Sequence, residues 1–269
     1  MLSTLRHYLS VYWVMLRNSL IREMSFKANF LLWILVEICW FTGQIVFIEV
    51  IYQYIDAIGD WTKWQMILLV ATHQLISQIY QAFFYMNVAN IPELIRTGKM
   101  DFMLMLPIDS QFAVSTKQFG LDNMVNGLVS AAIVAFSLNK LGIHPTLPQV
   151  LLYLGAIGFG VAIHYSVMFG LTTVSFWIVR AQGLISGYFN LFSLGRYPDV
   201  IFRGAIRFVF SWIIPVILVA NVPARVLMNT FQGPVWIPLT QLVLSSVFVL
   251  AASRAFWKIA LRQYTSASS

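Results

Sequence analysis

The sequence predicts an all-α integral membrane protein with six transmembrane helices. An N-terminal interfacial helix, a cytoplasmic helix and a broken segment before the last span complete the predicted fold. Of the 269 residues, 59% are apolar and only 10% are charged, whereas soluble proteins carry roughly 25% charged residues. The apolar residues fall in blocks of about twenty or more, the length that a helix needs to cross a bilayer. Several Trp residues lie at the ends of these blocks, as expected at a membrane–water interface.

The N-terminal segment predicts an amphipathic helix over residues 4–25 that lies in the membrane interface. Its apolar residues recur at helical spacing, and Arg6, Arg17 and Arg22 lie largely off that stripe. The arginines are spread along the whole segment, and no small-residue cleavage site follows a compact apolar stretch. We therefore do not expect a standard secretory signal peptide here.

Six candidate spans follow within a single transmembrane domain, residues 1–269. The fourth is longer than one crossing needs, and the fifth contains Pro215. With six crossings, both termini lie on the same side of the membrane. The predicted spans cover residues 28–54, 64–87, 119–138, 148–178, 208–222 and 235–258.

The basic residues predict which side is cytoplasmic. If the N-terminus is inside, fourteen of the seventeen Lys and Arg residues fall on the cytoplasmic side. The other side keeps only Lys63, Lys140 and Arg225. Cytoplasmic loops of membrane proteins carry such an excess of basic residues. The asymmetry predicts that both termini are cytoplasmic, and it explains the net charge of +7 without nucleic acid as a partner.

Residues 90–107 connect the second and third spans on the predicted cytoplasmic side. Asn90 and Glu93 have the spacing of a capping box, which would start a short helix. Gly98 can end that helix, and an apolar arm follows over residues 102–106. We expect a docking element for a cytoplasmic partner. The alternative is an ordinary interfacial loop helix.

The next predicted cytoplasmic loop, residues 193–208, contains a compact turn. Pro198 forces Tyr197 out of the helical conformation. Arg196 and Arg203 flank this turn, close to the predicted inner leaflet. Anchoring by positive charge explains the arginines, but it does not explain the turn.

The segment between the fifth and sixth predicted spans, residues 220–238, contains three prolines. These would break it into short helices that dip partway back into the membrane from the outside. Such re-entrant backbone is tolerated only where protein or a cavity covers it. A plain outer loop is the alternative.

Polar side chains inside the membrane are costly and often functional. Glu37 and Gln44 share one face of the first span, and Gln74, Gln78 and Gln81 share one face of the second. Because these faces must meet protein or water, they could line a translocation path or a dimer seam. They could equally bond a neighbouring helix.

No catalytic, cofactor-binding or metal-binding constellation appears in the sequence. The four histidines are scattered, no H-E-x-x-H motif occurs, and no G-x-x-x-x-G-K-[ST] loop is present to cradle ATP. We therefore expect that this chain is not an enzyme. If ATP drives it, another chain binds the nucleotide.

Two stretches resemble the permease subunit of an ABC-2 type exporter. The first is IPELIRTGKMDFMLMLPID, residues 91–109, with its Gly, an Asp three residues later and a closing Pro. The second is GRYPDVIFRG, residues 195–204, followed by SWIIPVILVANVPA, residues 211–224. The latter resembles one bacterial subfamily in particular. The similarity extends over essentially the whole chain.

The resemblance implies a complex with a cytoplasmic ABC ATPase dimer, which would bind ATP and Mg, and a second permease chain, identical or related. The region 90–107 would contain the coupling helix, with ATPase contacts at Glu93, Arg96, Gly98, Lys99 and Asp101. The complex would export an amphiphilic substrate, such as a drug-like molecule, lipid, glycolipid or peptide, across the bacterial inner (plasma) membrane. Efflux of this kind needs no cofactor on the permease itself.

Two other function classes stay open. A proton-coupled secondary carrier would use Glu37 or His164, although no inverted repeat is evident in the hydropathy. A membrane scaffold without transport activity is the other. Co-purification with a separate ATPase would distinguish the exporter from both.

Overall fold

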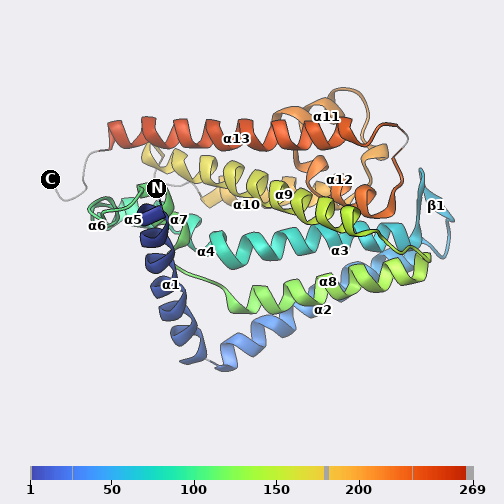
Figure 1. Ribbon diagram of the computed structural model, residues 1–269, viewed down its shortest axis with the longest axis horizontal. Coiled ribbons are helices and arrows are strands. Elements are labelled where there is room, and N and C mark those ends of the chain that lie inside the picture. The colour runs from blue at the N-terminus through green and yellow to red at the C-terminus, as the bar shows by residue number, and fades with distance from the viewer. Residues whose placement is uncertain (1, 26, 179–181, 232, 265–269) are drawn as a thin grey trace.

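The computed structural model describes residues 2–25, 27–178, 182–231 and 233–264. Over these residues the chain forms a bundle of long helices lying side by side (Figure 1). The only strands described in these ranges are the short antiparallel pair β1 (Ala57–Ile58) and β2 (Trp61–Thr62). The predicted all-α membrane class is confirmed.

Five helical segments in the described ranges are long and apolar enough to cross a membrane. They coincide, to within a few residues, with five of the six predicted spans. They are α2 (Lys27–Ile51); α3 (Lys63–Tyr80), extended by the π-helix η1 (Gln81–Tyr85) and α4 (Met86–Val88); α8 (Leu121–Leu141); α9 (Leu147–Thr173), extended by the 3-10 helix η2 (Val174–Phe176); and α13 (Trp236–Gln263).

The bundle has two distinct ends (Figure 1). One, the coupling end, carries three short helices, α5 (Ile91–Arg96), α6 (Met100–Leu104) and α7 (Ser110–Thr116), together with the end of α13. The other, the hairpin end, carries the β1–β2 hairpin. Helix α1 (Leu2–Ser25) begins at the coupling end and lies across the direction of the long helices.

The predicted fifth span, residues 208–222, is not one continuous helix. Helix α11 (Gly204–Phe208) and the π-helix η5 (Val209–Ile213) meet α12 (Val216–Met228) at an angle of 84°. The break follows from Pro215, because proline excludes the preceding residue from the helical region. Ile214 accordingly has φ −122° and ψ 83°.

Helix α10 (Gln182–Phe192) follows the fourth span and packs beside α9. The hydroxyl of Tyr188 in α10 lies 2.9 Å from His164 Nδ1 in α9. After α10, the 3-10 helices η3 (Ser193–Arg196) and η4 (Asp199–Ile201) lie at the hairpin end. Sequence periodicity missed α10 because its described part is only 11 residues long and directly follows the long fourth apolar block.

Residues 193–207 therefore lie at the end of the bundle opposite residues 90–118, and the prediction that both face the cytoplasm is wrong. Val200 packs so closely on the hairpin that its Cγ2 lies 2.5 Å from the position of a Cβ on Gly59. The whole predicted cytoplasmic loop therefore lies at the hairpin end, including Arg196, Tyr197, Pro198 and Arg203.

The basic residues remain asymmetric after this correction. Moving Arg196, Arg203 and Arg207 to the hairpin end leaves eleven of the seventeen Lys and Arg residues on the predicted cytoplasmic side and six on the other. The positive-inside rule still favours the coupling end as the cytoplasmic one.

A broken segment does precede the last span, but it starts earlier than predicted. It comprises α11, η5 and α12, rather than residues 220–238. Every residue of α12 is buried, and the helix packs against α3, α9 and α13. This covering by protein is what allows a broken helix at membrane depth.

Candidate coupling and translocation sites

The predicted break at Gly98 is present between α5 and α6. Gly98 has φ +70°, a left-handed conformation that glycine adopts with little strain. Beyond it, Met100 and Met103 are buried and anchor α6 to the bundle, whereas Phe102 and Met105 are 67% and 71% exposed. The segment 90–107 is therefore anchored on one face and open on the other.

The predicted capping box at the start of α5 is wrong. The Asn90 side chain makes no capping hydrogen bond, and its backbone is helical rather than extended. Glu93 instead accepts hydrogen bonds from Arg96, at 2.9 Å from Nε and 2.7 Å from Nη2. This pair engages both carboxylate oxygens of Glu93.

The open face of α5 and α6 is charged as well as apolar. Glu93, Arg96 and Lys99 are exposed, and Asp101 is half-buried. A surface of mixed charge beside exposed apolar side chains is suited to contact with another protein.

Helix α7 is joined to the last span by an ion pair. Asp109 caps α7 by accepting a hydrogen bond from Phe112 N–H at 3.0 Å, and its carboxylate also pairs with Arg254 of α13. Burial alone would raise the pKa of Asp109. The hydrogen bonds from Arg254 and Phe112 and the positive charge of Arg254 outweigh that effect and hold the pKa below its ordinary value.

Further hydrogen bonds tie α7 to two long helices. The indole of the fully buried Trp257 in α13 donates to Ser110 Oγ at 3.0 Å. The hydroxyl of Tyr165 in α9 bonds Gln111 at 3.1 Å and Ser115 at 2.9 Å. These contacts have no local signal in the sequence, because the bonded residues lie far apart in the chain. A displacement of α7 would act directly on α9 and α13.

The link from α7 to α8 runs past the π-helix η1. Asn87 bonds both backbone groups of Gln118, accepting from its N–H and donating to its C=O, each at 2.7 Å. Gly120 N–H donates to Ala82 C=O at 2.8 Å. A Cβ at Gly120 would lie 2.6 Å from Asn123 Nδ2, the end of a side chain that can move aside.

The polar stripes of the first two spans meet inside the chain. The side-chain amides of Gln78 and Gln74 donate to Glu37 Oε2 at 3.1 and 3.4 Å, which matches the helix-bonding alternative for these three residues. Gln44 lies further along α2 and accepts from Arg196 at 3.0 Å. Gln81 lines a cavity at the coupling end together with Glu37.

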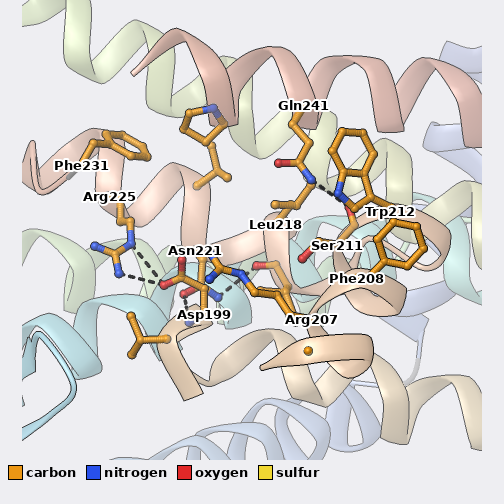
Figure 2. A pocket seen from close by; sticks show the side chains of 15 residues that line it. Asp199, Arg207, Phe208, Ser211, Trp212, Leu218, Asn221, Arg225, Phe231 and Gln241 are labelled. Carbon is orange, nitrogen blue, oxygen red and sulfur yellow. Dashed lines mark hydrogen bonds and ion pairs between the residues drawn. The ribbon is translucent and has the colours of Figure 1, made fainter. Parts of the chain in front are cut away.

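The hairpin end is held by a buried arginine that the sequence analysis assigned only to an outer loop. The Arg225 guanidinium pairs with Asp60 at 2.9 Å and Asp199 at 2.8 Å and lies 4.8 Å from the centre of the Trp61 ring. Asn221 accepts from Asp199 N–H at 2.9 Å. These contacts join α12, the hairpin and the turn after α10. Figure 2 shows Arg225 and Asn221 of α12 beside Asp199 of that turn.

This network borders a cavity of about 590 Å³. Figure 2 shows Arg207 between the side lined by Asp199 and the side lined by Phe208 and Trp212. Gln241 of α13 closes one wall by donating to Ser211 C=O at 3.2 Å. The cavity belongs to the broken segment rather than to the polar stripes predicted from the sequence.

The fold and these sites define a multi-pass helical membrane protein in which short elements at both ends form hydrogen bonds and ion pairs with the helices of the bundle. The model for the ABC-2 family transporter proteins matches residues 38–268, nearly the whole chain, so this protein belongs to that family. It is thus a membrane permease of an ABC transporter, as its sequence resemblance indicated. A comparison with curated proteins gave no match to this chain.

Proposed function

We propose that this permease exports an amphiphilic substrate from the cytoplasm, across the bacterial inner membrane, with energy from a separate ABC ATPase dimer. ATP and Mg would be bound by that partner, because this chain has no phosphate-binding loop of the usual pattern. The coupling end is the cytoplasmic one in this proposal, with both termini inside. The excess of basic residues on that side supports this orientation.

One observation carries the proposal: the exposed α5–α6 surface is bonded to the membrane bundle through α7. The ATPase would contact Glu93, Arg96, Lys99 and Asp101, and Gly98 would set the angle between the two short helices. Force on this surface would reach α13 through the Asp109–Arg254 pair. This arrangement provides a physical route from ATP hydrolysis to movement of the spans.

A second permease chain completes the proposed complex. Helix α2 is poorly covered within one chain, and Leu31, Leu35 and Phe47 are each more than 60% exposed. Large exposed apolar faces mark contacts with lipid or with another chain. Few helices surround Glu37 and the glutamines that bond to it, so a second copy or a related chain would enclose the proposed translocation path.

The test is an exchange of charges on α5. The double variant Glu93→Arg, Arg96→Glu keeps an ion pair three residues apart but reverses the charges that a partner meets. The matched control, Glu49→Lys with Lys63→Glu, reverses an exposed pair of 2.9 Å at the hairpin end. Tagged protein is purified from bacterial membranes, and captured ABC ATPases are identified and quantified by mass spectrometry.

The wild type and the hairpin-end control should capture an ABC ATPase, and the α5 variant should lose most of it. Gel filtration of each variant checks that the membrane fold is intact. Absence of any ABC ATPase from the wild-type preparation would contradict the exporter proposal. Equal capture by the α5 variant would contradict the role of this surface.

A further inference from the structure

A cavity of about 380 Å³ opens at the coupling end, between the first turns of α2, the π-helix η1 and the start of α8. Two carboxylates line it, Glu37 from α2 and Asp122 from α8, and none of the lining residues that the structure describes is Lys or Arg. Lys117, next to the lining residue Gln118, is exposed and does not line the cavity. The charged side chains described in the cavity wall are therefore both acidic.

Among the described residues, no basic side chain forms an ion pair with either carboxylate. Both amide bonds to Glu37 reach Oε2, and no described residue is bonded to its Oε1. Asp122 Oδ1 accepts only from a neutral amide, that of Asn123, at 3.1 Å. Two carboxylates in a partly dry site, without a basic neighbour, favour a cation as the ligand.

Aromatic rings supply the rest of the recognition chemistry. Phe30, Trp33 and Tyr85 line the same cavity. The faces of aromatic rings attract organic cations, and such rings also bury apolar groups. A small inorganic cation would gain little from three rings, whereas an amphiphilic organic cation would use both the rings and the carboxylates.

The cavity wall is built at an irregular part of the second span. Gln81 and Tyr85 are the first and last residues of η1, and both line the cavity. Single π-helical turns occur frequently at functional sites. Gln118, which Asn87 holds by two hydrogen bonds, forms part of the same wall. The link from the coupling helices thus borders the cavity directly.

We infer that this cavity is the substrate entry site and that it accepts amphiphilic organic cations. The inference rests on the proposed export function and names its substrate class. The volume lies within the range of about 300–1,000 Å³ that is usual for small-molecule sites. Glu37 and Asp122 provide the charge, and the rings hold the apolar part.

The test measures equilibrium binding to the purified chain in lipid nanodiscs, without an ATPase. The probes are tetraphenylphosphonium and tetraphenylborate, which have nearly the same shape and opposite charge, with binding to empty nanodiscs subtracted. Tetraphenylphosphonium should bind saturably and tetraphenylborate should not. Glu37→Gln should weaken the binding by about tenfold or more, the effect of losing one charged contact, and Asp122→Asn should weaken it less.

The control variant is Glu49→Gln, which removes a carboxylate from the same helix but outside the cavity. It should bind like the wild type. Equal binding of the two probes, or unchanged binding in the Glu37→Gln and Asp122→Asn double variant, would overturn the inference. Because no ATPase is present, that result would leave the exporter proposal untouched, and the capture experiment tests it separately.

Discussion

Replacement of Arg225 with Leu should destabilise the hairpin end more than any surface charge change. The Arg225 side chain is only 9% exposed, and its partners Asp60 and Asp199 are 31% and 24% exposed. The variant loses both ion pairs, the contact with the Trp61 ring and a hydrogen bond of 3.1 Å to Thr230 C=O. It also leaves two carboxylates close together without a cation.

The size of the effect follows from this burial. Removal of one partner from a buried ion pair costs about 3–5 kcal/mol. The two carboxylates keep part of their exposure and can bind water, so we expect a loss of about 2–3 kcal/mol in the free energy of unfolding. Lys63→Leu breaks an exposed pair with Glu49 and should cost less than about 1 kcal/mol.

The assay is unfolding of the purified chain by SDS in mixed micelles, followed by circular dichroism. A triple variant, Arg225→Leu with Asp60→Asn and Asp199→Asn, separates charge from packing, because it removes the carboxylate repulsion. It should recover a large part of the lost stability. The reasoning fails if Arg225→Leu matches Lys63→Leu, or if the triple variant is no more stable than the single one.

Two further predictions use the same assay. Because the pKa of Asp109 is lowered in the folded protein, its pairing with Arg254 stabilises the fold above the ordinary carboxyl pKa of 3.8, and this stabilisation is lost as the pH falls through the folded value. Asp109→Asn should therefore be less stable than the wild type at pH 7, and the two stabilities should converge in acid. A stability difference that stays constant with pH would contradict this. Gly195→Ala would place a Cβ 2.6 Å from Val216 C=O and should lower the free energy of unfolding by about 1–3 kcal/mol. Gly187→Ala places its Cβ in open space and should be neutral or stabilising. Similar stability of the two variants would refute the close contact.

The five long spans could be predicted because each is a continuous apolar block, and local composition is sufficient to recognise such a block. The chain between the fourth and the last long spans could not be predicted in the same way. Helix α10 is short and contains glycines, and the more apolar segment around Pro215 competed with it for the assignment. Composition alone could not show that this segment folds back, since the bend depends on what covers α12.

The candidate sites likewise contain residues that the sequence predicts and residues that it does not. Gly98 could be identified because a left-handed turn after a short helix favours glycine. The Asn90–Glu93 spacing was misleading, since a capping box needs both side chains free, and Arg96 holds Glu93. The pair of Asp60 with Arg225, 165 residues apart, has no local signal in the sequence at all.

The short connection between α7 and α8 limits how the two halves of the bundle can move. Residues 117–120 can span at most about 14 Å when fully extended, and Asn87 holds Gln118 near its middle. A large shift of α7 away from α4, which carries Asn87, therefore requires those two bonds to break. Gln118 also lines the cavity that contains Glu37 and Asp122. Small displacements of the short helices therefore leave this cavity unchanged, whereas larger displacements must open its wall.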